Sequence, residues 1–438
     1  MDFICCLLFK NMKKINLIMM LFLMICFRIK GETGQSKPAG QFIWKFKTGA
    51  RLFASPVAGN GKVYIGGEDH QVYAIAAKTG KEIWRFETGG AVNSSPVLAG
   101  ETIFVSSADG LLYALHAGTG KLKWKFRTQG ERKIGFKGLW GMLPADLYME
   151  DPYDFFISSP VVQQNGKTSL VYFGSGDGYL YALNASSGVL KWKFKTAGVI
   201  RSTPVLAQHK VYVGSWDTYF YALDQESGRL IWKFKTGEDQ KLHLMEGFQA
   251  SALVKDKMVY VGCRDGFFYA LDAEQGSLKW KYNAKGSWII STAAAGEGMV
   301  YTTTSDSYLF LALEAATGIE KYRIKTSGYN FSSPVLAGGQ AFFGDFSGQL
   351  YAVDLAKGNI NGIFETTARK LFKKDVLDEK YKLNFKYSAG GKDPMLYQTT
   401  LDVMKEFYKL GPIIAAPVIA GKMVYVSSTD GYLYALKY

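Results

Sequence analysis

The fold is decided by one stretch of sequence: Ser95-Pro96-Val97, Ile103-Phe104-Val105, Asp109-Gly110, Leu112-Tyr113-Ala114-Leu115, Gly120, Trp124-Lys125-Phe126. Its three apolar runs and its final aromatic run predict four short strands. The Asp-Gly pair supplies the positive φ angles of a tight hairpin, and the Thr-Gly pair at 119–120 turns the chain into the fourth strand. The stretch therefore predicts one four-stranded antiparallel sheet.

The same pattern recurs at a spacing of about forty residues, which is the period of propeller blades. Its proline position occurs eight times along the chain, at Pro56, Pro96, Pro160, Pro204, Ala252, Ala293, Pro334 and Pro417. The eighth copy stops before its outer strand, whereas residues 43–47 form an outer strand with no blade before it. We therefore predict an all-β, eight-bladed propeller over residues 41–438, with the ring closed by an N-terminal strand that completes the last blade.

An aromatic residue marks the outer strand of most copies. The tryptophans at this position are Trp44, Trp84, Trp124, Trp192, Trp232 and Trp280. Tyr322 replaces them in the sixth copy and Gly362 in the seventh. Because these side chains recur with the fold, we interpret them as packing between adjacent blades and not as a platform for a cofactor.

The repeat is interrupted three times, at residues 131–156, 238–247 and 367–412, always between an outer strand and the next inner strand. Equivalent connections emerge on one face, so we expect all three insertions at the same end of the propeller. The first carries many large apolar side chains. It predicts either a plug in the propeller mouth or a patch that binds a partner, with Phe136, Trp140, Tyr153 and Phe155 as candidates.

The third insertion predicts helices between blades 7 and 8. Asp393 can cap a helix whose first turn holds Pro394, and Gly411-Pro412 ends it. The basic residues of 369–374 precede this helix, and we interpret them as a solvated face.

Residues two positions before each inner-strand serine should ring the mouth of the axial channel. Most are apolar, and Asn93, Arg201 and Gln249 are the polar candidates. A lone arginine there can meet an acidic ligand or partner, although channel water can also solvate it.

The N-terminus is predicted to direct export. Residues 1–30 contain two lysines followed by an apolar run, the layout of a signal peptide or of a membrane or lipid anchor at Cys26, and Met12 is an alternative start to Met1. Of the formal charge of +14, this leader contributes +4 and leaves +10 spread thinly over the remainder. Cys263 is the only cysteine outside the leader, so no internal disulfide is expected.

The repeat resembles the PQQ-like (pyrroloquinoline quinone) β-propeller family of the quinoprotein alcohol dehydrogenase-like superfamily. The shared signature is Ser-Pro-Val, Asp-Gly, Tyr-Ala-Leu-Asp, Thr-Gly and Trp-x-Phe. The resemblance covers residues 41–438. It implies either a quinone-dependent dehydrogenase with calcium or a non-catalytic member of the BamB type.

Three observations favour the non-catalytic class. The adjacent cysteines typical of the alcohol-oxidising members occur here only at 5–6, in the leader, and no group of carboxylates stands at inner-strand starts to bind calcium. The four histidines share no metal-ligand spacing. We therefore expect a monomeric, exported scaffold in the periplasm, at the outer membrane or on the cell surface. It should bind another envelope protein, without cofactor, metal or nucleic acid. A quinoprotein with a divergent site is the alternative, and a sensor of carbohydrate or peptide is a third interpretation.

Overall fold

The computed structural model describes residues 37–163, 169–236 and 247–438. The predicted leader at 1–30 and nearly all of the second insertion at 238–247 lie outside them. None of the helices in the described residues is long and apolar enough to span a membrane.

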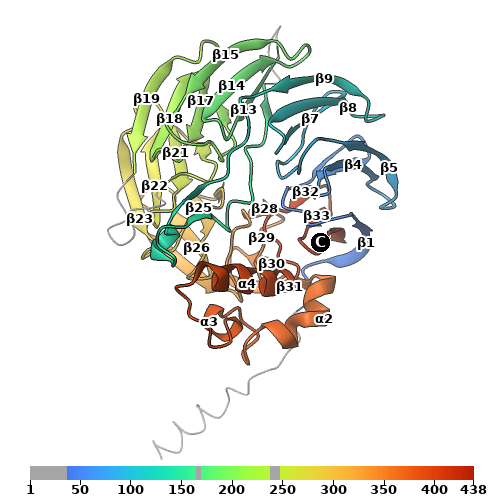
Figure 1. Ribbon diagram of the computed structural model, residues 1–438, viewed down its shortest axis with the longest axis vertical. Helices are drawn as coiled ribbons and strands as arrows, with labels where there is room; N and C mark the ends of the chain where they lie inside the picture. The colour runs from blue at the N-terminus through green and yellow to red at the C-terminus, as the bar shows by residue number, and fades with distance from the viewer. Residues whose placement is uncertain (1–36, 164–168, 237–246) are drawn as a thin grey trace, which may run out of the picture. The chain divides into compact units, whose positions relative to one another are not determined.

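Eight four-stranded antiparallel sheets form the blades of the unit that starts at Pro38 (Figure 1). The first four blades contain, in order, β2 (Val57–Gly59), β3 (Lys62–Gly66), β4 (Gln71–Ala76) and β5 (Glu82–Glu87); β6 (Val97–Ala99), β7 (Thr102–Ser107), β8 (Leu111–His116) and β9 (Leu122–Arg127); β12 (Val161–Val162), β13 (Leu170–Gly174), β14 (Tyr179–Asn184) and β15 (Leu190–Lys195); β16 (Val205–Ala207), β17 (Lys210–Gly214), β18 (Tyr219–Asp224) and β19 (Leu230–Lys235).

The other four blades repeat this order. They contain β20 (Leu253–Lys255), β21 (Met258–Gly262), β22 (Phe267–Asp272) and β23 (Leu278–Asn283); β24 (Ala294–Gly296), β25 (Met299–Thr303), β26 (Leu309–Glu314) and β27 (Glu320–Lys325); β28 (Val335–Ala337), β29 (Gln340–Gly344), β30 (Gln349–Asp354) and β31 (Asn359–Glu365); β32 (Val418–Ala420), β33 (Met423–Ser427), β34 (Tyr432–Lys437) and β1 (Gln41–Lys47). The prediction of eight blades is confirmed.

The ring closes as predicted, through the two ends of the chain. β1 pairs antiparallel with β34, with Trp44 opposite Ala435 and Lys47 opposite Tyr432. The N–H of Thr48 extends this ladder by donating to the carbonyl of Gly431 (2.8 Å). The last blade therefore takes three strands from the C-terminal end and one from the N-terminal end.

The insertions add a small sheet and three helices. β10 (Gly135–Lys137) and β11 (Tyr148–Glu150) form a two-stranded hairpin, with the short 3-10 turn η1 (Leu139–Gly141) between them. The helices are α2 (Thr367–Val376), α3 (Phe385–Ser388) and α4 (Tyr397–Tyr408). They lie together at one side of the ring, next to β30 and β31 (Figure 1).

Two details of the helical insertion differ from the sequence prediction. Asp393 does not cap α4, because its carboxylate accepts from the N–H of Met395 and the helix begins only at Tyr397. Arg369 is not on a solvated face: it is 2% exposed, pairs with Glu365 at 2.9 Å and donates to the carbonyl of Ser347. Both errors arise because contacts between distant segments position these residues: Arg369 contacts blade 7, and the segment before α4 pairs with Leu143 of the first insertion.

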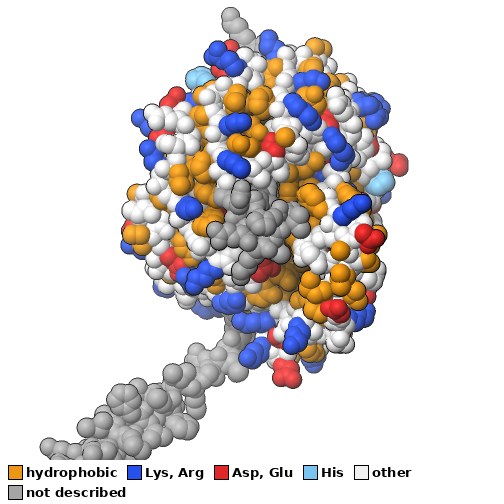
Figure 2. All heavy atoms as spheres, turned by 60° about the vertical axis from the view of Figure 1, so that its left-hand side comes forward, with side chains coloured by type: hydrophobic (Ala, Val, Ile, Leu, Met, Phe, Trp, Pro, Cys, Tyr) orange, Lys and Arg blue, Asp and Glu red, His pale blue; other side chains and the backbone are white. Residues whose placement is uncertain are grey.

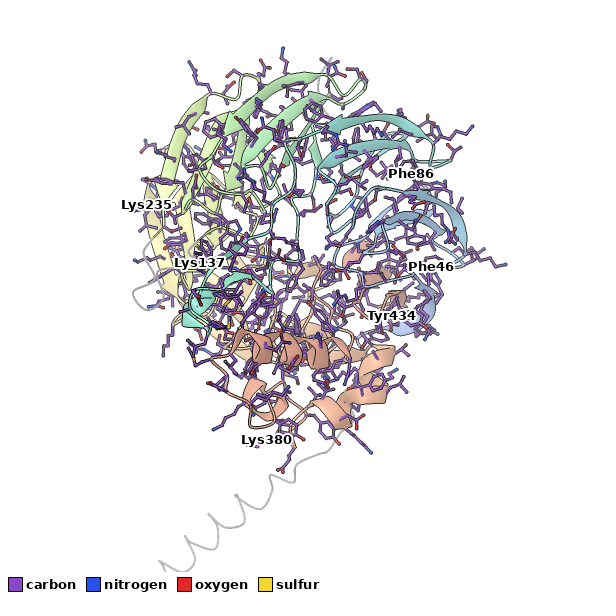
Figure 3. All side chains as sticks on the ribbon, in the orientation of Figure 1. Phe46, Phe86, Lys137, Lys235, Lys380 and Tyr434 are labelled. Atoms are coloured by element: carbon purple, nitrogen blue, oxygen red, sulfur yellow. The ribbon has the colours of Figure 1, made fainter. Side chains whose placement is uncertain are left out.

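The tryptophans lie at the junctions between blades. The indole Nε1 of each donates to a backbone carbonyl of the next blade, at 2.9 to 3.2 Å, and the acceptors in order are Ala77, Ala117, Ala185, Gln225, Ala273 and Ala315. The glycine of the next blade's turn packs against the ring: a Cβ at Gly80 would lie 2.7 Å from Trp44. Outer-strand phenylalanines such as Phe46 and Phe86 pack edge-on against a tyrosine of the next blade (Figure 3).

The missing tryptophan of the seventh blade has a structural reason. A Cβ on Gly362 would lie 2.8 Å from the carbonyl oxygen of Pro38 and 2.9 Å from Cα of Ala39. Ala39 is 5% exposed and packs with Phe342 and Phe364 in one apolar cluster. The N-terminal segment therefore fills the space that an indole fills at the other junctions.

Candidate functional site

The first and third insertions meet at one end of the propeller. Leu143 forms a parallel bridge with Leu396, its N–H donates to the carbonyl of Met395 (2.7 Å), and its carbonyl accepts from Tyr397 (3.1 Å). The hydroxyl of Tyr397 also donates to the carbonyl of Glu150 (2.7 Å). We call residues 131–156 and 367–412 together the insertion cap.

The first insertion has two parts with different surroundings. Residues 135–150 form the β10–β11 hairpin at the surface, and residues 151–156, which we call the plug, enter the propeller mouth. The ring of Phe155 stacks on Phe53 with centroids 5.3 Å apart and also contacts Phe331 at 5.8 Å. Tyr153 contacts the same Phe331 at 5.8 Å. Both plug aromatics belong to a large apolar cluster with α4.

Two of the four candidate partner-binding residues lie in the plug, which is one of the two alternatives that the sequence left open. Tyr153 is 8% exposed and Phe155 is 6% exposed, because both rings fill the space above the inner strands. Trp140 is half-buried and packs on Tyr153 and Trp288. Phe136 alone of the four is exposed.

Arg201 binds the plug. Its guanidinium contacts the carboxylates of Asp154 at 2.7 Å and Glu131 at 2.9 Å. Burial acts to lower the pKa of Arg201, but these two carboxylates outweigh it and raise the pKa above its usual value. The sequence left open an acidic ligand or water as the partner of this arginine. In the structure its partners are the acidic residues of the first insertion.

A second buried arginine, Arg264, binds the start of the plug. It contacts Asp151 at 2.7 Å, and both side chains are fully buried. Its guanidinium lies over the rings of Trp216 and Trp288, 4.7 and 4.2 Å from their centroids. Burial raises the pKa of Asp151, and the charge of Arg264 opposes that effect. Arg264 was not among the candidates predicted from the sequence, although it directly precedes the repeat's Asp265, where no other copy has a basic residue.

The three axial candidates lie around one cavity. Asn93, Arg201 and Gln249 line a space of about 330 Å³ in the channel, on the inner side of the plug. Gln249 is also used by the plug, since its amide nitrogen donates to the carbonyl of Tyr153 (3.3 Å) and its oxygen accepts from Arg264 (2.8 Å). The Oδ1 of Asn93 is buried and has no hydrogen-bond partner in the described residues.

Within residues 37–163, 169–236 and 247–438, no group of three or more His, Cys, Asp or Glu side chains is placed to hold a metal ion. Cys263 is fully buried, and burial raises the pKa of its thiol well above the usual value. This places the thiol among core residues, as a small apolar group.

A comparison with protein families gives a match that covers most of the propeller. The family described as "Outer membrane protein assembly factor BamB" matches residues 33–138, 137–283 and 246–368. A sequence comparison with curated proteins gives no match.

Solved structures with similar folds come from both functional classes. BamB from Moraxella catarrhalis is 15% identical, with a TM-score of 0.64 over 91% of this chain and 100% of that one. A europium-containing methanol dehydrogenase is also 15% identical, with a TM-score of 0.64 over 91% and 93% of the two chains. The quinohemoprotein alcohol dehydrogenase from Comamonas testosteroni is 14% identical, with a TM-score of 0.64 over 90% and 76%.

At these identities the likeness to solved structures shows the fold alone. The family match spans most of the chain, from the segment before β1 to the start of α2. The chain therefore belongs to the PQQ-like propeller family described as outer membrane protein assembly factor BamB.

Proposed function

We propose that the protein is a non-catalytic scaffold of the cell envelope that binds another envelope protein through its insertion cap. The observation that supports this most directly is a group of apolar side chains on the cap that the propeller does not bury. Their exposed fractions run from 39% to 57%, and they are Phe136, Leu143, Leu147, Tyr148, Met395 and Leu396. We call these six residues the apolar patch.

Backbone contacts hold the patch together. Lys137 pairs with Tyr148 across the hairpin, and the N–H of Gly138 donates to the carbonyl of Leu147 (3.0 Å). The bridge between Leu143 and Leu396 joins this hairpin to the segment before α4. Hydrophobic side chains form patches beside lysines and arginines on this side of the molecule (Figure 2). Contiguous apolar surface of this kind is typical of a protein-binding site.

The patch rests on a rigid base. Leu139, Met142 and Met149 are at most 4% exposed and form a small apolar cluster beneath the hairpin. The hydroxyl of Thr400 on α4 also lies 3.4 Å from the sulfur of Met142. A surface held in one conformation before binding loses little conformational entropy when the partner arrives.

The resemblance and the family description support the remaining parts of this proposal. They favour export to the periplasm or outer membrane, with membrane contact only through an N-terminal anchor if one is retained. We propose a monomer that takes part in an envelope assembly complex and binds no nucleic acid.

The alternative, a quinone-dependent dehydrogenase, fits the axial site poorly. The resemblance places quinone and calcium near the propeller axis. Here the rings of Tyr153 and Phe155 fill the mouth, and none of the described residues that line the cavity behind them carries a carboxylate. Calcium binds through several oxygen ligands that usually include carboxylates. We therefore propose that neither quinone nor calcium is a resident cofactor.

Site-specific photo-crosslinking tests the binding surface. A crosslinker at position 148 should capture one envelope protein in intact cells, and the same probe at Ile319 should not. Ile319 is a matched control because it is 59% exposed on the outer edge of blade 6. The proposal is wrong if both positions capture the same proteins equally.

Purified components then test the affinity. The variant Phe136→Ser, Tyr148→Ser, Met395→Ser should bind the captured protein at least about tenfold more weakly, since a few large apolar residues dominate most interfaces. Val189→Ser with Ile319→Ser serves as the control variant.

Quinone titration with calcium tests the alternative. We expect neither a stoichiometric change in quinone absorbance nor dye-linked oxidation of alcohols or sugars. Tight one-to-one binding would contradict the scaffold proposal.

A further inference from the structure

A belt of hydroxyl groups surrounds the axial cavity behind the plug. The position just before the inner-strand proline carries a hydroxyl in seven of the eight blades, at Ser55, Ser95, Ser159, Thr203, Ser251, Thr292 and Ser333. Ala416 takes this position in the eighth blade. All eight residues line the same cavity of about 330 Å³. We call the seven hydroxyls the hydroxyl belt.

Backbone groups set the direction of these hydroxyls. In five places the N–H of one belt residue donates to the hydroxyl oxygen of the belt residue in the next blade. The pairs are Ser55 to Ser95 (3.0 Å), Ser95 to Ser159 (2.8 Å), Ser159 to Thr203 (3.3 Å), Thr203 to Ser251 (2.8 Å) and Thr292 to Ser333 (2.8 Å).

The protons of these five hydroxyls have no protein acceptor among the described residues. A serine or threonine hydroxyl can donate one hydrogen bond and accept two, so each oxygen also keeps a free lone pair. The belt therefore offers the cavity several donors and acceptors at one level of the channel.

The rest of the cavity wall is mainly apolar. Phe53, Phe156 and Phe331 line it together with Ile290 and Ile414. Asn93 stands among them, and its side-chain oxygen has no partner although the residue is only 9% exposed. This oxygen is buried and does not face the cavity, so a ligand would meet mainly the apolar rings and the hydroxyl belt.

The described residues give the cavity no unpaired charge. The only charged side chain that they contribute to its wall is Arg201, which is paired with Asp154 and Glu131. An anion would meet no unpaired cation here, and a cation would meet no carboxylate on the wall. The ligand that matches this wall is therefore neutral.

We propose that the axial cavity binds a neutral polyhydroxylated molecule, a monosaccharide, a disaccharide or a cyclic polyol. Such a ligand exchanges hydrogen bonds with the hydroxyl belt and places its C–H faces on the phenylalanine rings. The cavity volume is at the lower end of the range of small-molecule sites, which agrees with one or two sugar rings. This inference does not depend on the scaffold proposal, because the patch and the cavity are separate.

Calorimetry and saturation-transfer NMR on the full chain test this site. The probes are glucose, galactose, trehalose, maltose and myo-inositol, with sodium phosphate, sodium acetate and sodium chloride as charged comparisons. We expect saturable binding of at least one neutral probe, with magnetisation transferred to its ring protons. Binding of phosphate, acetate or chloride without any neutral probe, or no binding at all, would overturn the proposal.

Two variants locate the binding. Ser55→Ala with Thr292→Val removes two belt hydroxyls that accept no N–H from the described residues, so it should weaken binding at least about tenfold while leaving Tm within a few degrees. Ala416→Ser adds the missing hydroxyl and should bind the same probe as tightly as the parent chain or more tightly. Unchanged affinity in a folded Ser55→Ala, Thr292→Val variant would overturn the proposal.

Discussion

The two parts of the first insertion have similar composition and opposite surroundings. The hairpin at 135–150 leaves Phe136, Leu147 and Tyr148 exposed, whereas the plug at 151–156 buries Tyr153 and Phe155. What separates them is charge. The plug carries Asp151 and Asp154, each paired with a buried arginine of the propeller, while no such pair within the described part of the chain anchors the exposed aromatics. Apolar content alone thus does not show which part of an insertion enters a core.

The largest expected effect is the loss of the plug aromatics. Tyr153→Ala with Phe155→Ala should lower the free energy of unfolding by more than the roughly 3–5 kcal/mol of a single large aromatic, because both rings lie in one cluster. Urea unfolding measures the change. A loss below about 1 kcal/mol would mean that the plug is not part of the core.

Breaking the ion pair at the start of the plug should have the next largest effect. Arg264→Met leaves the carboxylate of Asp151 buried without its partner, which costs about 3–5 kcal/mol at pH 7. The double variant Arg264→Met, Asp151→Asn should recover much of that loss, since no buried charge remains unpaired. If the double variant is no more stable than Arg264→Met, the charge of Asp151 is not the cause.

The stability loss of Arg264→Met should also depend on pH. Burial raises the pKa of Asp151, and removal of Arg264 takes away the group that opposes this. A carboxyl group whose pKa is higher in the folded state than in the unfolded state, where it is about 4, stabilises the folded state below pH 4. This stabilisation is lost as the pH rises through the pKa of the folded state. The deficit of Arg264→Met relative to the parent chain should therefore shrink as pH falls toward 4. Urea unfolding at pH 4, 5.5 and 7 measures it.

The smallest expected effect belongs to the hairpin. Phe136→Ser with Tyr148→Ser should change the free energy of unfolding by no more than about 0.5 kcal/mol, as for other exposed positions. A loss comparable to that of the plug variant would remove the contrast between the two parts, and with it the argument that the patch is free to bind a partner.

The propeller could be predicted because its repeats carry local information. Asp109-Gly110 determines a hairpin wherever it occurs, and Trp44 without a preceding blade indicates how the ring closes. The spacing of the repeats in the sequence was enough to predict where these elements lie. The glycine at 362 could not be explained in this way, since the segment that fills its space comes from the other end of the chain.

The insertions follow no period, and their structure depends on contacts between distant segments. Leu143 pairs with Leu396, and Arg264 pairs with Asp151. The sequence showed that an aromatic insertion lies near the mouth, but both outcomes, plug and patch, stayed open. In the structure residues 151–156 form the plug, and the hairpin at 135–150 stays at the surface. Arg264 was missed because a single basic residue in a turn is usually solvated, and nothing local indicates its partner.

The closing strand also has a consequence for how the chain reaches its folded state. Gln41 at one end of the ladder pairs with Lys437, so the first strand of the unit must wait for the last one before it gains a neighbour. Contacts between such distant residues form slowly, and seven blades can assemble earlier from hairpins close in sequence. During synthesis β1 thus stays unpaired until β34 emerges, which makes this strand a natural place for chaperones to bind and for proteases to cut before the ring closes.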